Sequence, residues 1–277
     1  MIPNLIIQTG PRDLPVLLNS AIATVKLLHP RFEYRLFDDA TISTFLREYF
    51  PEYRAEYDSF RFQIQRYDFF RYLAIYRYGG FYLDLDVFLA QSLTPLLTSS
   101  CVFPFEELAQ AKFFWERFRM DWTIGNYAFG AEPAHPFLAA IIDNCLRAKK
   151  DPEWVKPMMS GIPPFARSEF YILNTSGPGL VSRTFAENPQ LVRDVKILFP
   201  EDVCEVRSWQ QFGAFGVHHM LGSWRQQQRF FPRRLRRIWE QRTLKRVLAD
   251  GRARGKTRNL GTGVGLTQME VQPFRGK

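Results

Sequence analysis

Strand-like and helical patterns alternate through the first 90 residues, and this alternation is the strongest constraint on the fold of the chain. The sequence predicts a short buried strand at residues 4–9 and further strands at 33–38 and 81–89. Between these strands, apolar residues recur at helical spacing over residues 14–28, 40–49 and 63–78. A β-α-β-α-β order predicts an α/β fold with an open, largely parallel sheet and helices on both faces. In such sheets, ligands bind at the carboxyl ends of the strands.

The pattern loosens after residue 100 but still predicts ordered elements. We expect strands at 101–105, 126–131, 195–199 and 214–221. We expect helices at 135–149, from about residue 179, and over about 230–249. A segment rich in Pro and Gly at 157–164 predicts a loop.

Positive charge is concentrated near the C-terminus. The formal charge is +9, while residues 225–258 hold 13 Lys and Arg against 2 Asp and Glu, a balance of +11 that leaves −2 for the remainder. We expect residues 226–250 to form a basic amphipathic helix, and the Gly-rich, polar residues 251–277 to be disordered. Such a helix can lie on anionic lipid, bind nucleic acid or remain solvated.

The composition also indicates a compartment. No apolar run approaches the roughly 18 to 20 residues of a membrane span, and the N-terminus lacks the basic and apolar regions of a signal peptide. Three widely spaced cysteines, Cys101, Cys145 and Cys204, fit neither a disulfide framework nor a zinc site. We therefore expect a cytoplasmic protein in a reducing environment.

Asp84 and Asp86 stand two residues apart in the strand predicted at 81–89, so their side chains should share one face. Two carboxylates buried side by side repel each other and lose their hydration. A divalent cation removes this conflict, because Mg²⁺ and Mn²⁺ prefer carboxylate oxygens and often carry a phosphate group as a further ligand. The pair therefore suggests a metal site, with two solvated aspartates at a strand end as the alternative.

The helix before this strand supplies further polar residues. Asp68 and Arg71 are three residues apart and share a helix face. Arg66 precedes them, and Tyr82 follows a Gly-Gly turn at the end of the helix. Together with the two aspartates they form the string R-x-D-x-x-R-x(7)-G-G-x-Y-x-D-x-D. The helix runs directly into the strand, which places its Asp–Arg pair near the same strand end.

This string resembles the sugar-binding region with the DXD motif of a glycosyltransferase family. The family includes the yeast initiating α-1,6-mannosyltransferase, the inositol-phosphorylceramide mannosyltransferases and many bacterial capsule or lipopolysaccharide transferases. Four further segments resemble it: IPNLIIQTG, NYAFGAEPAHP, TSGPGL and HHMLGSW. Ile7 stands where the family usually has His, and Ser176 is inserted into the T-G-P loop. The resemblance covers roughly residues 2–225.

The resemblance implies a fold and a reaction. The fold is of the GT-A type, a Rossmann-like, mostly parallel central sheet flanked by helices, in a catalytic domain at residues 1–225. The implied donor is a UDP- or GDP-hexose, the metal Mn²⁺ or Mg²⁺, and the acceptor a glycan or a lipid-linked glycan. Transfer is expected to retain the anomeric configuration by attack on the face from which the diphosphate leaves. Lipid-linked acceptors favour docking of the basic helix at the inner face of an anionic membrane, with no nucleic-acid partner.

The family's functional residues carry over to matching positions. The expected metal ligands are Asp84, Asp86 and His218, with His219 as the alternative to His218. The residues expected to contact the donor are Gln8, Thr9, Arg66, Asp68, Arg71, Tyr82, Asp84, Asn126, Ser223 and Trp224. Asp84, Asp86 and Arg71 are expected to act in catalysis by stabilising the leaving diphosphate. Gly177 and Pro178 are expected to shape a loop over the site.

Two other functions compete with this one. DLDV at 84–87 also fits the nucleophile strand of haloacid-dehalogenase-type phosphatases, but that class needs a later Lys and a downstream acidic pair at a strand end. The pairs Glu106-Glu107 and Glu201-Asp202 lack the surrounding strand and Gly pattern. The non-enzymatic alternative is a protein that binds membranes or nucleic acid through its basic helix.

Overall fold

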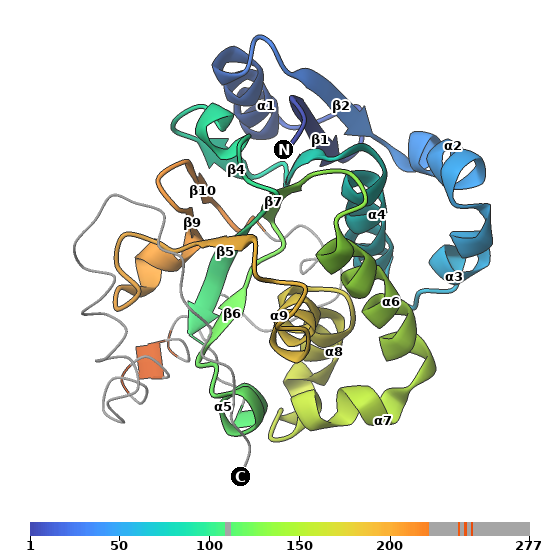
Figure 1. The fold of residues 1–277 in the computed structure, drawn as a ribbon, viewed down its shortest axis with the longest axis vertical. Helices are drawn as coiled ribbons and strands as arrows, with labels where there is room; N and C mark the ends of the chain where they lie inside the picture. The colour runs from blue at the N-terminus through green and yellow to red at the C-terminus, as the bar shows by residue number, and fades with distance from the viewer. Residues whose placement is uncertain (109–111, 222–237, 239–240, 243–244, 246–277) are drawn as a thin grey trace.

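The computed structural model describes residues 1–108, 112–221, 238, 241–242 and 245 (Figure 1). Its strands are β1 (Leu5–Thr9), β2 (Glu33–Phe37), β3 (Gly80–Leu83), β4 (Val87–Leu89), β5 (Cys101–Leu108), β6 (Trp122–Ile124), β7 (Ala128–Ala131), β8 (Val195–Leu198), β9 (Gln211–Phe212) and β10 (Gly216–His218). Its α-helices are α1 (Val16–Leu28), α2 (Asp39–Tyr49), α3 (Arg54–Asp58), α4 (Gln63–Tyr78), α5 (Lys112–Phe118), α6 (Pro136–Lys150), α7 (Pro152–Val155), α8 (Arg167–Thr175) and α9 (Pro178–Glu187).

Seven strands form the central sheet in the order β2-β1-β3-β7-β5-β6, with β8 paired to β5. β1 is parallel to β2 and β3, and β5 is parallel to β8. β7 is antiparallel to β3 and β5, and β6 is antiparallel to β5. Five of the seven strands therefore run in one direction. This mostly parallel α/β sheet confirms the expected fold class and agrees with the GT-A type that the resemblance implied.

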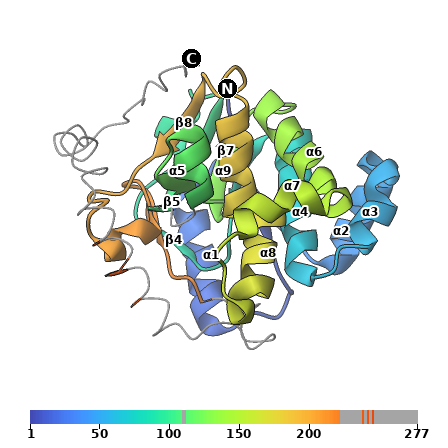
Figure 2. The same ribbon diagram turned by 90° about the horizontal axis from the view of Figure 1, so that it is seen from below.

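Helices cover both faces of this sheet, as expected. On one face, Ile7 and Tyr82 point into a large core built with α2, α4, α6 and α9. α4, α6 and α9 lie in a row against this face (Figure 2). On the other face, Ile6 and Phe81 point into a second core with Val25 of α1. The alternation of strand side chains thus divides one sheet between two cores.

A small antiparallel sheet completes the second face. It has the order β4-β10-β9, and it brings residues 211–218 back to the segment that follows β3. Phe212 and Phe215 from this region pack in the second core. The small sheet therefore joins a late part of the chain to the D-x-D segment.

One predicted strand is wrong in a way that matters for the site. Residues 81–89 do not form a single strand: β3 ends at Leu83 in the central sheet, and β4 begins at Val87 in the small sheet. The Val87 N–H donates to the backbone oxygen of Asp84 at 3.1 Å and closes a turn between them. The two carboxylates leave the strand here, because the chain must cross from one sheet to the other.

Other boundaries follow local chemistry. α4 has the predicted bounds, and Gly79 and Gly80 after it have positive φ values of 67° and 93°. A Cβ on Gly80 would lie 2.5 Å from the Leu5 backbone oxygen, so glycine is required there for two reasons. α2 begins with a capping box in which Asp38 and Thr41 bond each other's backbone N–H.

Several predicted elements are shorter, and others were missed. β7 and β10 occupy only part of the strands predicted at 126–131 and 214–221, and α8 was not predicted. The predicted basic helix at 226–250 and the tail at 251–277 lie outside the described residues, apart from 238, 241–242 and 245, which are helical. Among the described residues, none of the helices has the length and apolar character needed to cross a bilayer.

Candidate active site

The turn between β3 and β4 presents Asp84 and Asp86 from an anchored backbone. The Asp84 N–H donates to the backbone oxygen of Tyr127 at 2.7 Å, on the β7 side. On the β1 side, the fully buried Gln8 donates from Nε2 to the backbone oxygen of Asp84 at 3.2 Å. The Tyr34 hydroxyl donates to Gln8 Oε1 at 2.9 Å and holds this amide in place. The neighbouring strands therefore hold the turn on both sides.

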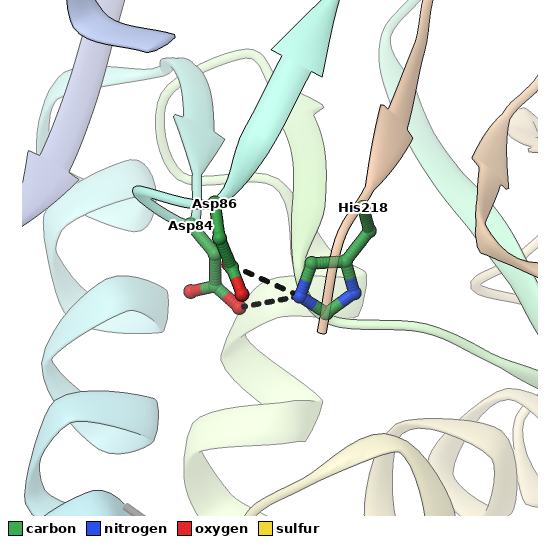
Figure 3. Close-up of side chains that lie close together, drawn as sticks. All are labelled: Asp84, Asp86 and His218. Atoms are coloured by element: carbon green, nitrogen blue, oxygen red, sulfur yellow. Dashed lines mark ion pairs between the residues drawn. The ribbon is translucent and has the colours of Figure 1, made fainter. Parts of the chain in front are cut away.

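Asp84, Asp86 and His218 converge on one point (Figure 3), with one ligand atom from each lying within 4.8 Å of the others. His218 Nε2 lies 3.2 Å from Asp86 Oδ1 and 3.9 Å from Asp84 Oδ2. The pairing of β10 with β4 sets His218 opposite Val87, directly after the turn. The three side chains are 14–24% exposed, so the cluster is accessible from one side. Two carboxylates and an imidazole are a suitable donor set for a divalent cation.

His218 and His219 occupy different environments. The His218 ring stacks on Tyr127, with centroids 4.4 Å apart and an interplanar angle of 18°. The His219 ring packs edge-on against Phe88 at 4.6 Å, and its backbone N–H donates to the Asp86 backbone oxygen at 2.9 Å. Adjacent side chains of an extended segment point to opposite sides. The structure therefore brings His218, and not His219, to the two carboxylates.

Arg71 of α4 connects the turn to the helical layer. Its guanidinium lies 3.2 Å from a carboxylate oxygen of Asp68 and 3.2 Å from one of Asp84, and its side chain is 4% exposed. It also donates to the backbone oxygen of Asn126 at 2.8 Å. The guanidinium lies over the Tyr82 ring at 4.5 Å, and the Tyr82 hydroxyl donates to Asp84 Oδ1 at 3.0 Å. One buried cation therefore serves two carboxylates and orients Asp84.

Asp68 lies deeper and is held by several donors. Asn126 Nδ2 donates to its Oδ1 at 3.1 Å, and Ser176 Oγ donates to its Oδ2 at 2.7 Å. Tyr72 joins the same network, because its hydroxyl donates to the Ser176 backbone oxygen at 2.7 Å and accepts from Asn126 Nδ2 at 2.8 Å. Ser176 lies between α8 and α9. The network thus ties α4, the segment before β7 and the α8–α9 loop together.

The three carboxylates differ in their electrostatics. Burial raises the pKa of Asp84, although Arg71 and His218 oppose the shift. Burial also raises the pKa of Asp68, to about 6, against the attraction of Arg71. For Asp86, burial acts in the same direction, but hydrogen bonds from His218 and from a backbone N–H after β10 outweigh it and hold the pKa below its ordinary value. Asp86 therefore keeps its negative charge most readily of the three.

The structure gathers most of the residues expected to contact a donor. The network and the turn contain Asp68, Arg71, Tyr82, Asp84 and Asn126. Thr9 joins them through a 2.9 Å contact between its hydroxyl and that of Tyr82. Gln8 supports the turn from the β1 side, with its amide bonded to protein atoms.

Arg66, Ser223 and Trp224 are not placed with this group. Arg66, in the first turn of α4, donates to the backbone oxygen of Asp58 at the end of α3 at 2.8 Å. Residues two apart on a helix lie about 200° apart around its axis, so Arg66 and Asp68 point in different directions. Ser223 and Trp224 lie outside the described residues.

Three contacts of the site were missed from the sequence. Tyr127 stands next to Asn126 in the motif NYAFGAEPAHP, yet its ring stacks on His218, which lies 91 residues later in the chain. Ser176 was treated as an insertion, although it donates to Asp68. Tyr72 of α4 was not among the expected site residues, and its hydroxyl partners distinguish it from the other core residues of that helix.

Comparison with known proteins agrees with the resemblance seen in the sequence. Residues 15–103 match the family model described as "Glycosyltransferase sugar-binding region containing DXD motif". The chain is 34% identical over 147 residues to inositol phosphoceramide mannosyltransferase 3 of Schizosaccharomyces pombe, a match that covers 53% of this chain and 38% of that protein. It is 27% identical over 183 residues to mannosyl phosphorylinositol ceramide synthase CSH1 of Saccharomyces cerevisiae, with coverage of 66% and 42%.

Among solved structures, the PaToxG glycosyltransferase is similar with 13% identity and a TM-score of 0.47, over 68% of this chain and 70% of that one. The chain spans 38% to 42% of the length of the two curated relatives named above. The family match contains both the Asp68–Arg71 pair and the Asp84–Asp86 turn. Residues 15–103, which hold both pairs, are therefore similar to the DXD sugar-binding region of glycosyltransferases.

Proposed function

We propose that this protein is a metal-dependent glycosyltransferase that moves a hexose from a nucleotide-diphosphate sugar to a hydroxyl group of a glycan or glycolipid. The observation that carries the proposal is the cluster of Asp84, Asp86 and His218, in which a histidine from late in the chain lies beside two aspartates of an early turn. The match of residues 15–103 to the DXD sugar-binding region supports sugar transfer as the reaction.

The three side chains fit Mn²⁺ or Mg²⁺. Carboxylate oxygens suit both ions, and an imidazole nitrogen in the set favours Mn²⁺. Asp86 is the main proposed ligand, because its depressed pKa keeps it ionised and hence able to bind a cation. Partial exposure of the cluster leaves one side open to water or substrate oxygens. When bound, the ion supplies positive charge that attracts the donor diphosphate and stabilises it on departure.

The remaining residues orient these groups and the sugar. Arg71 holds Asp84 through a 3.2 Å ion pair and adds positive charge behind the turn. Asp68 and Asn126 are proposed to face the sugar hydroxyls. Asp68 and Asp84 both contact Arg71 and accept hydrogen bonds from protein donors, so neither is a free nucleophile. This arrangement favours retention by same-face attack, with the acceptor proton passing to a diphosphate oxygen. A trapped covalent glycosyl-enzyme would contradict that mechanism.

The names of the curated relatives suggest the first substrates to test. Two of them are named for mannosyl transfer to, or synthesis of, inositol phosphoceramides. We therefore propose mannose as the first hexose to test, supplied as a GDP- or UDP-sugar, and a glycolipid with an inositol phosphate headgroup as the first acceptor. The phosphatase alternative predicts turnover of p-nitrophenyl phosphate with Mg²⁺, which we expect to be absent.

A thermal-shift screen of nucleotide sugars with Mn²⁺ tests the proposal on the full chain. A specific donor should raise the melting temperature of the wild type, because a ligand that binds the folded state stabilises it. Asp86→Asn should lose this shift and reduce release of nucleoside diphosphate by roughly 100-fold or more, since even indirect supports of metal ligands are worth about 10- to 100-fold. Asp13→Asn, at an exposed position, is the matched control.

Two outcomes would contradict the proposal. The first is that no nucleotide sugar shifts the wild-type melting temperature with Mn²⁺ present. The second is an equal shift in Asp86→Asn, which would show that the donor binds without the cluster.

A further inference from the structure

α1 and the small sheet form one outer layer over the second core. Val25 of α1 and Val87 and Leu89 of β4 point into this core together. α1 contacts β4, and β4 pairs with β10 (Figure 1). The sides of α1, β4 and β10 that point away from this core therefore face outward on the same side of the molecule. We call this surface the α1 face and define it by Val16, Leu17, Leu27, Phe88 and Val217.

Large apolar side chains project from the α1 face into solvent. The exposed ones are Val16 (83%), Leu27 (80%), Leu17 (51%) and Val217 (41%). They are four of the seven exposed large hydrophobic side chains in the described part of the chain. Val16 and Leu27 lie on one stripe of α1, because an interval of 11 residues is about three helical turns. On β10, Val217 stands directly opposite Phe88 of β4, which is partly exposed. The exposed apolar groups thus gather on one face.

The segments that build this face contain no acidic residue. Residues 14–32, 87–100 and 211–221 include Lys26 and Arg31 but neither Asp nor Glu, in a chain with 28 Asp and Glu among 277 residues. A soluble protein partner could bind these apolar groups whether the residues around them were acidic or basic, so it does not explain the lack of acidic residues. A lack of acidic residues beside two cations is instead the pattern that an anionic membrane surface selects, because its negative potential attracts basic groups and repels acidic ones.

We propose that the α1 face docks on the surface of a lipid bilayer that carries anionic headgroups. The exposed side chains of α1 enter the boundary between headgroups and acyl chains. Arg31 and the exposed Lys26, whose ammonium lies 4.3 Å from the centre of the Tyr34 ring, supply positive charge beside them. The residues that define this surface are not those of the basic segment at 226–250, and lipid binding by the α1 face does not depend on the transferase activity.

Docking through α1 also positions the candidate active site. A Cβ placed on Gly10 would lie 2.4 Å from Leu85 Cδ1 and 3.9 Å from Leu14 Cδ2. Leu14 stands two residues before α1, and Leu85 is the central residue of the Asp84–Asp86 turn. The membrane-facing helix therefore begins beside the turn, where it can bring a lipid-borne acceptor close to the site.

Vesicle flotation with the full chain tests the proposal. Wild type should float with vesicles of phosphatidylcholine and phosphatidylserine. The double variant Val16→Glu/Leu27→Glu places acidic groups at exposed positions, and it should bind these vesicles about tenfold or more weakly, because binding scales with apolar area and with charge. The double variant Ala40→Glu/Thr44→Glu makes the same charge change at exposed positions of α2 and should bind like wild type. Unchanged melting temperatures show that both variants are folded.

Three results would overturn the proposal. Wild type that does not float excludes lipid as the occupant of the α1 face. Equal flotation of Val16→Glu/Leu27→Glu and wild type assigns any binding to another part of the chain, such as residues 226–250. Wild type that dimerises without vesicles, while Val16→Glu/Leu27→Glu stays monomeric in sedimentation, makes a second copy of the chain the occupant. None of these results bears on donor binding, which is measured separately.

Discussion

Two adjoining groups of polar residues in this protein both place a carboxylate beside a basic side chain, but they differ in burial. The network of Asp68, Arg71 and Ser176 lies inside the protein, where the Asp68 and Arg71 side chains are about 5% exposed. The cluster of Asp86 and His218 lies at the edge of the sheet, with side chains 14% exposed. In the network, protein donors surround the carboxylate. In the cluster, one side remains accessible.

This difference separates the support of a site from the site itself. A buried carboxylate is stable only when other protein groups compensate its charge, so the network is expected to determine stability. A partly exposed carboxylate with a depressed pKa can exchange its partner for a metal ion, so the cluster is expected to determine ligand binding. Asp84 belongs to both, because it contacts Arg71 on one side and His218 on the other.

Replacing the shared cation is the most severe test of this division. Arg71→Met leaves Asp68 and Asp84 without their common partner, and breaking a buried pair costs about 3–5 kcal/mol of the free energy of unfolding. Urea denaturation at neutral pH measures the loss. Arg54→Met is the control, because Arg54 forms a 2.7 Å pair with Asp58 in which both side chains are exposed. Its cost should be below about 1 kcal/mol. Equal costs for the two variants would show that the network does not support the fold.

The titration of Asp68 provides a second, smaller effect. Its pKa in the fold is about 6, above the ordinary value of 3.8. Between these values the folded state holds a proton that the unfolded state releases, so stability is highest at low pH and falls as the pH rises. Asp68→Asn lacks this titration. We expect the unfolding free energy of wild type to fall relative to Asp68→Asn by up to about 3 kcal/mol from about pH 3 to about pH 7.

Denaturation curves at several pH values measure this difference. Asp13→Asn serves as the control for the same substitution at an exposed position. A constant difference between wild type and Asp68→Asn across this range would mean that burial does not dominate the electrostatics of Asp68.

The smallest expected effect concerns the hydroxyl of Ser176. Ser176→Ala removes the donor to Asp68 Oδ2, and a hydrogen bond to a charged group contributes about 1.5–3 kcal/mol. The cost should be near the lower value and should shrink below pH 6, where Asp68 becomes protonated. Ser182→Ala is the matched control, because Ser182 is equally buried but bonds the neutral backbone of Pro178 and Ile124. The assignment of the Ser176 hydroxyl as a donor to charged Asp68 would be refuted if the cost of Ser182→Ala varied with pH. It would also be refuted if the cost of Ser176→Ala were the same at every pH.

Much of the scaffold was predictable because it depends on local patterns. The bounds of α4 follow from helical spacing and a Gly-Gly stop, and β1 follows from a short apolar run. The D-x-D segment was predictable as a site, but its backbone was not. A continuous strand pattern at 81–89 hides the turn, because β4 pairs with β10, which lies more than 120 residues later in the chain.

The roles of individual polar residues were likewise predictable only where they depend on local spacing. Asp68 and Arg71 were placed on one helix face by their spacing, and they do form an ion pair. Arg66 belongs to the same sequence string, yet its guanidinium donates to the backbone oxygens of Asp58 and Phe60, which precede α4. Ser176 had no recognisable pattern, because its partner lies on α4, 108 residues earlier in the chain.

Spacing and residue type are local properties, and from them we could predict the alternation of strands and helices through the first 80 residues, the resemblance to DXD glycosyltransferases, and the acids and bases of the candidate site. The pairing of His218 rather than His219 with the carboxylates, the turn that takes Asp84 and Asp86 out of the strand, and the difference between the supporting network and the accessible cluster are visible only in the folded chain. Burial, pKa and ion pairing depend on neighbours that distant parts of the chain contribute.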